Sequence, residues 1–267
     1  MVKFCVLASG SAGNTSFVGT SKTRVLVDAG LSVKDVTRRL NEIGEDPLEI
    51  DAVLITHEHC DHVAGLARFV RWRAKQKKPV AVYVSRLTAP MLDWSTDGKQ
   101  PEQPAPVERF QAGSGWMLGN IAVQSFTIPH DAVDPVGFTF LAEGIKIGVA
   151  TDLGYMPDSV RHHLRRTQIL LIESNHDLDM LKVGPYPWSV KQRVMGRNGH
   201  LSNGVTCDYI ENDLDSGVQT LILGHLSEHN NHPEIVRIGA EQSLERRGIS
   251  PNLVVAEQKR QTEVFTY

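Results

Sequence analysis

Short apolar runs and amphipathic segments of helical period alternate along this chain. Short runs rich in Val, Ile and Leu predict strands, and segments in which apolar residues recur every three or four positions predict helices. The expected strands cover 3–8, 15–19, 23–27, 51–56, 80–84, 121–127, 136–141, 145–150, 168–173, 218–223, 252–256 and 262–266. The expected helices cover 33–43, 63–76, 86–93, 158–165, 189–197, 202–212 and 233–247.

These strands are more than one open sheet holds comfortably, so we expect two stacked mixed sheets with helices on the outer faces. The fold class is therefore α/β (α+β). No Pro/Ser linker, repeat or low-complexity tract divides the 267 residues. One domain over residues 1–267 is the expected organisation, because large sandwiches reach this length.

The densest group of metal-binding side chains lies in LITHEHCDHV, residues 54–63. His57, His59, Asp61 and His62 form an H-x-H-x-D-H pattern directly after an apolar run that predicts a buried strand. His57 and His59 face the same way if the strand geometry persists, and Asp61 and His62 then belong to the following turn or the first turn of a helix. Imidazole and carboxylate ligands without a thiolate suit Zn²⁺, Mn²⁺ or Fe²⁺.

Three further strand ends each deliver one ligand-type residue. The predicted strands over 121–127, 145–150 and 218–223 are followed by His130, Asp152 and His225. Each residue alone is as typical of a cap or a turn, but together with the first cluster they make seven ligands. Seven ligands that include one bridging carboxylate describe two adjacent divalent metal ions, about 3.5–4 Å apart.

H-x-H-x-D-H followed by His, Asp and His at strand ends resembles the metallo-β-lactamase-fold hydrolases. Five other motifs are similar to the YycJ (WalJ) family: LASGSAGN (7–14), ESNHDLDML (173–181), YPW (186–188), GHLSN (199–203) and HLSEHNN (225–231). The resemblance extends from about residue 3 to 265. It implies a four-layer αββα sandwich, a dinuclear metal centre and nuclease activity on DNA, with 5′→3′ exonuclease action on duplexes.

The resemblance also assigns the ligands. Metal one takes His57, His59 and His130; metal two takes Asp61, His62 and His225; and Asp152 bridges both. None of Cys5, Cys60 and Cys207 falls at the bridging position. Cys60 lies at a variable position of the cluster and is expected to pack. The two ions are expected to be Zn²⁺ or Mn²⁺, because nitrogen and oxygen ligands discriminate poorly between them.

The expected chemistry is attack on phosphorus by a metal-bridging hydroxide, since two divalent cations lower the pKa of a shared water. Asp61 is the candidate to orient that water or accept its proton. Related tRNA-maturing enzymes use a Glu–His pair in corresponding motifs, which implies His200 as proton donor to the leaving group and Glu173 as its partner. Two alternatives remain open: Glu173 as a buried carboxylate that accepts backbone amides, and His200 as a turn residue.

Six other polar residues are candidates for substrate binding. They are Ser9, Ser11 and Asn14 in a Gly-rich turn, His176 in ESNHD, and Ser227 and Asn230 after His225. A tight hairpin turn explains the first three equally well. A loop hydrogen bond explains His176, and helix capping explains the last two.

The net charge of −3 gives the chain no overall basic character, so a nucleic-acid substrate requires a local patch. Arg68, Arg71 and Lys75 form one candidate stripe along the predicted helix over 63–76, which an ordinary solvated helix face explains as well. Arg73 lies on the apolar side of that helix, and its head is expected to reach water past its stem.

Three cysteines without regular spacing, no apolar signal-peptide core and no run of 18 apolar residues lead us to expect a soluble, cytoplasmic protein without a membrane partner. The sequence indicates no obligate protein partner and leaves the oligomeric state open. The first functional hypothesis is a dinuclear metal-dependent hydrolase acting as a DNA phosphodiesterase or exonuclease. The alternatives are a small-molecule phosphodiesterase, such as a cyclic-phosphodiester hydrolase, or a thioesterase, and lastly a non-catalytic metal-binding regulatory protein.

Overall fold

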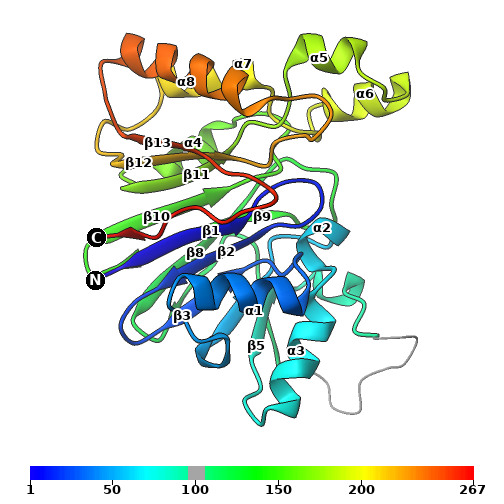
Figure 1. The fold of residues 1–267 in the computed structure, drawn as a ribbon, viewed down its shortest axis with the longest axis vertical. Coiled ribbons are helices and arrows are strands. Elements are labelled where there is room, and N and C mark those ends of the chain that lie inside the picture. The colour runs from blue at the N-terminus through cyan, green and yellow to red at the C-terminus, as the bar shows by residue number, and fades with distance from the viewer. Residues whose placement is uncertain (96–105) are drawn as a thin grey trace.

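The fold, described by a computed structural model for residues 1–95 and 106–267, is built around two stacked β-sheets (Figure 1). Within these residues each sheet has seven strands. The strand order is β14-β1-β2-β3-β4-β5-β6 in the first sheet and β13-β12-β11-β10-β9-β8-β7 in the second. Both sheets are mixed, with antiparallel pairing on one side and parallel pairing on the other. The predicted pair of stacked mixed sheets is therefore confirmed.

The first sheet consists of β14 (Phe265–Thr266), β1 (Lys3–Ala8), β2 (Thr15–Gly19), β3 (Arg24–Val27), β4 (Ala52–Leu54), β5 (Ala81–Ser85) and β6 (Val107–Phe110). The second consists of β13 (Asn252–Val255), β12 (Thr220–Gly224), β11 (Ile169–Glu173), β10 (Ile145–Ala150), β9 (Val136–Ala142), β8 (Ile121–Thr127) and β7 (Gly115–Leu118). The strands β3 to β6 are parallel to one another in the first sheet, and the strands β10 to β13 are parallel to one another in the second.

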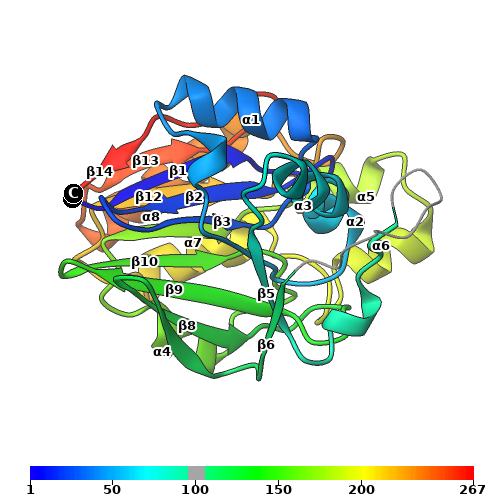
Figure 2. The same ribbon diagram turned by 90° about the horizontal axis from the view of Figure 1, so that it is seen from below.

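Helices cover the outer faces of both sheets (Figures 1 and 2). Helices α1 (Val33–Glu42) and α3 (Leu66–Lys75) pack on the first sheet, and α4 (Asp158–Leu164), α7 (Asn203–Asn212) and α8 (Pro233–Arg247) pack on the second. One apolar core lies between the sheets, and one lies under each helical layer. Burial of three such cores on folding is what orders the four layers.

Three short helices lie at one end of the sandwich, away from both termini (Figures 1 and 2). They are α2 (Cys60–Val63), α5 (Leu178–Val183) and α6 (Trp188–Val194). The strands β3, β4, β10, β11 and β12 end at this same end, because parallel strands present their carboxyl ends together. This end is where the chemistry-bearing side chains meet.

Some predicted elements differ from the structure. Instead of a helix over 86–93 there is a single 3₁₀ turn, η2 (Ala89–Met91), because Ser85 Oγ accepts the Thr88 N–H and Pro90 has no N–H to donate. The strand over 262–266 shortens to β14. The strands β6 and β7 and the helix α5 were not predicted. The β6 sequence VERF carries two charges and becomes a strand only by pairing with β5.

The prediction for Arg73 is wrong. Its side chain is buried, and its guanidinium donates to the backbone carbonyls of Lys78 (2.9 Å), Pro47 (3.1 Å) and Ile50 (2.8 Å). Arg73 therefore fastens α3 to the chain around the 3₁₀ turn η1 (Pro47–Glu49). Arg68 and Lys75 are exposed on α3, and Arg71 is half-buried. In the part of the chain that the structure describes, no helix is long and apolar enough to cross a membrane.

Candidate metal centre

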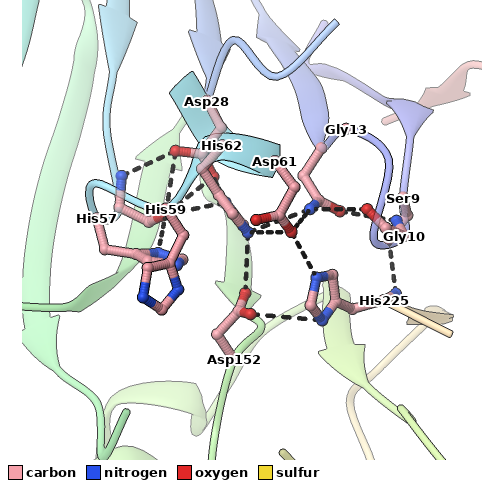
Figure 3. A network of polar contacts seen from close by, with 12 residues as sticks. Ser9, Gly10, Gly13, Asp28, His57, His59, Asp61, His62, Asp152 and His225 are labelled. Carbon is pink, nitrogen blue, oxygen red and sulfur yellow. Dashed lines mark hydrogen bonds and ion pairs between the residues drawn. The ribbon is translucent and has the colours of Figure 1, made fainter. Parts of the chain in front are cut away.

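Three residues that follow strands adopt an uncommon backbone conformation. Asp28 after β3, Asp152 after β10 and His225 after β12 have φ values of 61°, 62° and 57°. Such left-handed conformations cost a non-glycine residue about 1–3 kcal/mol and persist only where the surroundings impose them. Here they turn each side chain at its strand end toward one common point (Figure 3).

The H-x-H-x-D-H segment occupies the loop after β4 and the start of α2. His59 is the N-cap residue of α2, and Asp61 and His62 lie in its single turn, as predicted. The Asn14 N–H donates to the Asp61 carbonyl (2.7 Å), and the Ala29 N–H donates to the His62 carbonyl (2.8 Å). Backbone contacts with the loops after β1 and β3 thus hold the cluster in place.

The predicted ligands form two groups. The first ligand group is His57, His59 and His130, and the second is Asp61, His62 and His225; in each, one ligand atom per residue lies within 4.8 Å of the others. Asp152 lies between the groups, with Oδ2 at 3.3 Å from His62 Nε2 and Oδ1 at 3.8 Å from His130 Nε2. The structure therefore brings all seven predicted ligands together. All of them except His130 are labelled in Figure 3.

The four buried imidazoles of the ligand groups are each anchored through Nδ1. His62 Nδ1 lies 2.8 Å from Asp28 Oδ2, and His225 Nδ1 lies 2.7 Å from Glu173 Oε1. His57 Nδ1 contacts the Thr56 hydroxyl (2.9 Å), and His130 Nδ1 contacts the Gly199 carbonyl (3.1 Å). Anchoring of one ring nitrogen fixes the ring orientation and leaves Nε2 for a metal.

Two buried polar atoms at the meeting point have no hydrogen-bond partner among the described residues: His57 Nε2 and Asp152 Oδ2. A buried polar group without a partner is costly, so such atoms indicate that a ligand belongs there. The surrounding donors are imidazole nitrogens and carboxylate oxygens, a set that divalent transition-metal ions prefer. The residues present fit divalent cations at this point.

The pKa shifts follow from burial and from the carboxylates. Burial holds the pKa of His57 well below its usual value, so this imidazole is neutral and able to bind a cation. Burial also lowers the pKa of His225, but Asp152, Asp61 and Glu173 outweigh it and raise that pKa to about 10. The pKa of Asp152 lies well below its ordinary value, because His225 and His62 outweigh the cost of burial, and the carboxylate is ionised.

Glu173 is both a buried carboxylate that accepts backbone amides and a partner of His200, the two interpretations considered for it. Its Oε2 accepts the N–H groups of Leu153 and Leu201, each at 2.9 Å. Its Oε1 lies 2.9 Å from His200 Nδ1 and 2.7 Å from His225 Nδ1. Burial raises the pKa of Glu173, but His200 and His225 outweigh it and lower that pKa to about 2. A buried, ionised carboxylate thus holds two imidazoles at once.

His200 lies at the edge of a cavity of about 330 Å³ above the ligand groups. Its side chain is partly exposed, in contrast to the buried Glu173 beside it. Burial lowers the pKa of His200, but Glu173 and Asp152 outweigh it, and the net shift is upward. An imidazole anchored at Nδ1 and open to a cavity can exchange a proton with a bound molecule.

The six residues predicted to bind substrate divide into two sets. Ser11, Ser227 and Asn230 line the cavity, and the Asn230 Oδ1 atom is buried without a partner among the described residues. Ser9 and Asn14 are buried and contact the ligand groups instead: Ser9 Oγ accepts the His225 N–H (2.7 Å), and Asn14 Nδ2 donates to Asp61 Oδ2 (3.1 Å). His176 is buried and does not line the cavity.

Several residues of the site were not predicted. Asp28 is the most important, because its carboxylate contacts His62 Nδ1 and accepts the Thr56 N–H at 2.9 Å. Its signal was present, since it ends the apolar run 25–27 as Asp152 ends 147–150. Asn175, Tyr186 and Arg193 also line the cavity. The first two lie in motifs quoted for the resemblance but were not singled out as site residues, and Arg193 lies in none of these motifs.

The expectation that Cys60 packs is wrong. Cys60 is exposed and lines the cavity, because it is the first residue of α2 and the packed side of that turn carries His62. Cys5 is buried in β1 and Cys207 is half-buried in α7. All three cysteines are free thiols in the structure.

Comparisons with known proteins agree with this geometry. Residues 23–226 match the family described as "Beta-lactamase superfamily domain". The chain is 36% identical over 237 residues to exodeoxyribonuclease WalJ of Streptococcus pneumoniae serotype 2 (strain D39), which covers 88% of this chain and 86% of that protein. It is 34% identical over 245 residues to exodeoxyribonuclease YycJ of Bacillus anthracis, which covers 92% and 90%.

A solved structure shares the fold. The metallo-β-lactamase fold protein YhfI from Bacillus subtilis aligns with a TM-score of 0.69 over 98% of this chain and 99% of that chain, at 14% sequence identity. At this level of identity the likeness shows only a shared arrangement of sheets and helices, and it says nothing about the chemistry of the site.

Proposed function

Because this chain belongs to the metallo-β-lactamase superfamily and, within it, to the family of the WalJ and YycJ exodeoxyribonucleases, we propose that it hydrolyses the phosphodiester bonds of DNA. The predicted family and the predicted αββα sandwich are confirmed. The chain is a metal-dependent hydrolase by family and by its His/Asp clusters. Its action as a 5′→3′ exonuclease on duplexes is part of the proposal.

The fold implies divalent metal ions, and we propose two of them, Zn²⁺ or Mn²⁺. The first ligand group would hold one ion, the second ligand group would hold the other, and Asp152 would contact both. When bound, such ions supply a water of lowered pKa and neutralise negative charge on phosphoryl oxygens.

Two side chains of this protein would act directly on the attacking water and the leaving group, and a third would position one of them. Asp61, held by Asn14 and His225, would keep one carboxylate oxygen toward the water and orient it. His200 would donate a proton from Nε2 to the leaving oxygen, because Glu173 holds its Nδ1 at 2.9 Å and the ring borders the cavity. Glu173 would act as a positioning residue through His200.

The polar rim of the cavity supports an anionic substrate. Ser11, Ser227 and Asn230 border the cavity beside His200, and Arg193 supplies a guanidinium at the same rim. We propose that these groups bind the phosphates next to the one that is cut. Ser9, Asn14 and His176 do not line the cavity. Ser9 and Asn14 would support the ligand groups through their contacts with His225 and Asp61, and His176 would hold its loop through its backbone carbonyl, which accepts the Asn203 N–H (2.8 Å).

We also propose that residues 1–267 form one domain. Support comes from the core between the sheets, which includes Val2 and Phe265 together with residues of both sheets. The observation that carries the functional proposal is the convergence of seven nitrogen- and oxygen-bearing ligands from four separate segments of the chain, at the wall of one cavity that four of them line.

The test is hydrolysis by the purified protein loaded with Mn²⁺ or Zn²⁺. Its substrates are duplex DNA labelled at either the 5′ or the 3′ end, the matching single strand, and bis(p-nitrophenyl) phosphate. Release of labelled mononucleotides from the 5′ end supports the proposal, and His57→Ala is the metal-site control. Cleavage of the small ester alone would favour a small-molecule phosphodiesterase, and cleavage of neither substrate by any metal-loaded form would favour a metal-binding regulator.

A further inference from the structure

One wall of the cavity differs in charge from the rest of the chain. This wall is the segment 182–197, which we call the α6 rim, and it carries four cationic residues and no Asp or Glu, whereas the whole chain has a net charge of −3. Its cations are Lys182, Lys191, Arg193 and Arg197. Lys182 pairs with Asp179 and Lys191 is buried, so Arg193 and Arg197 are the exposed cations of the rim that a phosphate backbone could reach.

The α6 rim is held together by a side-chain hydrogen bond, and its backbone contacts the loops that carry His200 and Asp152. The Lys191 ammonium donates to the Lys182 carbonyl (2.7 Å), which ties the two ends of the α5–α6 turn together. The His200 N–H donates to the Val194 carbonyl (2.9 Å). A Cβ on Gly154 would lie 2.0 Å from the Arg197 carbonyl oxygen, so the end of the rim packs directly on the loop that follows Asp152.

Two aromatic rings stand at the start of α6. Tyr186 borders the cavity, and Trp188, two residues further on, is 62% exposed. Tryptophan is highly buried on average, so a ring that is mostly exposed two residues along the chain from a cavity-lining residue indicates a binding role. Aromatic faces stack on unpaired bases of any sequence, which makes a single strand a better occupant than an intact duplex.

Two guanidinium groups stand at the other end of α6. Arg193 borders both the cavity and a neighbouring hollow of about 470 Å³, which Arg197 also lines. Arg193 binds Asp131 through Nε, and no acceptor within residues 1–95 and 106–267 binds its two Nη groups. Arg197 is exposed and its guanidinium lies 4.3 Å from the centre of the Tyr155 ring. Arg197 lies three residues beyond the end of α6, and both arginines line the same hollow.

Building on the nuclease function proposed above, we infer that the α6 rim holds a single-stranded end of the DNA. Tyr186 and Trp188 stack on bases, while Arg193 and Arg197 bind successive phosphates along the same strand. The rim therefore selects frayed or unpaired ends and leads them to the cavity bordered by His200. Neither α5 nor the Tyr186–Trp188 turn contributes a metal ligand, so the rim serves binding and not chemistry.

The first experiment compares hydrolysis of a labelled single strand with hydrolysis of bis(p-nitrophenyl) phosphate by the metal-loaded protein. Trp188→Ala should lower the ratio of the two kcat/KM values about tenfold, as expected for the loss of one base stack. Trp188→Phe should restore most of the ratio, because a phenyl ring still stacks. Met117→Ala is the matched control, since Met117 is also 62% exposed and does not line the cavity.

The second experiment measures Kd for a phosphorothioate single strand at several salt concentrations. Arg193→Gln and Arg197→Gln should each reduce the slope of log Kd against log salt by about 0.7, one phosphate contact on a single strand. Trp188→Ala should weaken binding without changing the slope. Arg260→Gln is the charge control, because Arg260 is exposed, pairs with Glu257 and lies outside the cavity.

The outcomes separate this inference from the proposed function. A wild-type protein that cleaves no DNA refutes the nuclease proposal and the rim with it. DNA cleavage that is equal in wild type, Trp188→Ala and the two arginine variants refutes the rim alone. A change in oligomeric state of Trp188→Ala by light scattering, without a change in DNA binding, would assign the exposed ring to a contact between copies of this chain and overturn the inference.

Discussion

The two ligand groups both contain buried histidines, but these histidines are anchored differently. In the second group, His62 and His225 contact the buried carboxylates of Asp28 (2.8 Å) and Glu173 (2.7 Å). In the first group, His57 contacts a hydroxyl and His130 contacts a backbone carbonyl, both neutral acceptors. A carboxylate partner makes an imidazole more basic and a stronger ligand. We therefore expect the second group to hold its cation more tightly than the first.

Exposure adds to this difference. His59 of the first group has a side chain that is 29% exposed, whereas His62 and His225 are almost entirely buried. A ligand that faces solvent is easier to displace, because water competes for the cation and the ring is less constrained. The first group should consequently be the one that empties first under a chelator.

The largest expected effect is that of Asp152→Ala, because this carboxylate lies between the two groups. Activity should fall by about 10³-fold or more, since the loss of a shared anionic ligand removes several kcal/mol of transition-state stabilisation. Bound metal per chain, measured by inductively coupled plasma mass spectrometry, should fall as well. Asp158→Ala, at a carboxylate that is 97% exposed, is the control. Full metal content in Asp152→Ala would contradict the bridging role.

His200→Ala should separate chemistry from metal binding. Turnover should fall by about 10²- to 10⁴-fold, the usual contribution of a positioned general acid. Metal content should match the wild type, because His200 belongs to neither ligand group. DNA and small-ester turnover are the measurements. Turnover equal to that of the wild type would remove His200 from the mechanism.

Asp28→Asn should weaken the second group selectively. The loss of a carboxylate partner costs a metal site about 10- to 100-fold in affinity. Competition with a chromophoric chelator should show that the tighter of two binding steps is weakened and the other is not. Weakening of both steps to the same degree would show that the two groups are not independently anchored.

The smallest effect concerns thiol reactivity. Burial raises the pKa of Cys5 to about 11, so this thiol stays protonated and unreactive at pH 8 and would form thiolate only at much higher pH. Cys60 is exposed at the cavity between His59 and Asp61. Iodoacetamide at pH 8 should label Cys60 first, and metal loading should slow that labelling. Mass spectrometry of tryptic peptides measures both rates, and labelling of Cys5 before Cys60 would be the contrary result.

The sequence predicts a site residue only where a local sequence pattern around that residue indicates its role. The cluster His57–His62 is local, and four ligand-type residues in six positions are visible without any fold. His130, Asp152 and His225 were found because each follows a short apolar run, and strands that lie side by side bring such ends together. Asp28 also follows a short apolar run, but it was missed, because a lone Asp after a strand is as typical of a cap or a turn and the family resemblance assigns no ligand to it.

Residues whose contacts form only in the tertiary structure have no such local sequence pattern. Ser9 and Asn14 lie in the motif of a Gly-rich turn, and only the structure shows that they hold His225 and Asp61. Arg73 lies on the apolar face of its helix. The three backbone carbonyls that accept hydrogen bonds from its guanidinium belong to residues 5 to 26 positions away along the chain. The strands β6 and β7 likewise depend on their neighbours for pairing.

Local periodicity and the order of polar groups after apolar runs were enough to predict the layered architecture and the candidate ligands, because these features repeat within a few residues. The resemblance of short motifs indicated the family. The division of the ligands into a carboxylate-anchored group and a neutrally anchored group could be decided only by packing. So could the solvent exposure of Cys60 and of Trp188. A contact between Asp28 and His62 or between Glu173 and His225 joins residues 34 and 52 positions apart, and no pattern along the chain records such a distance.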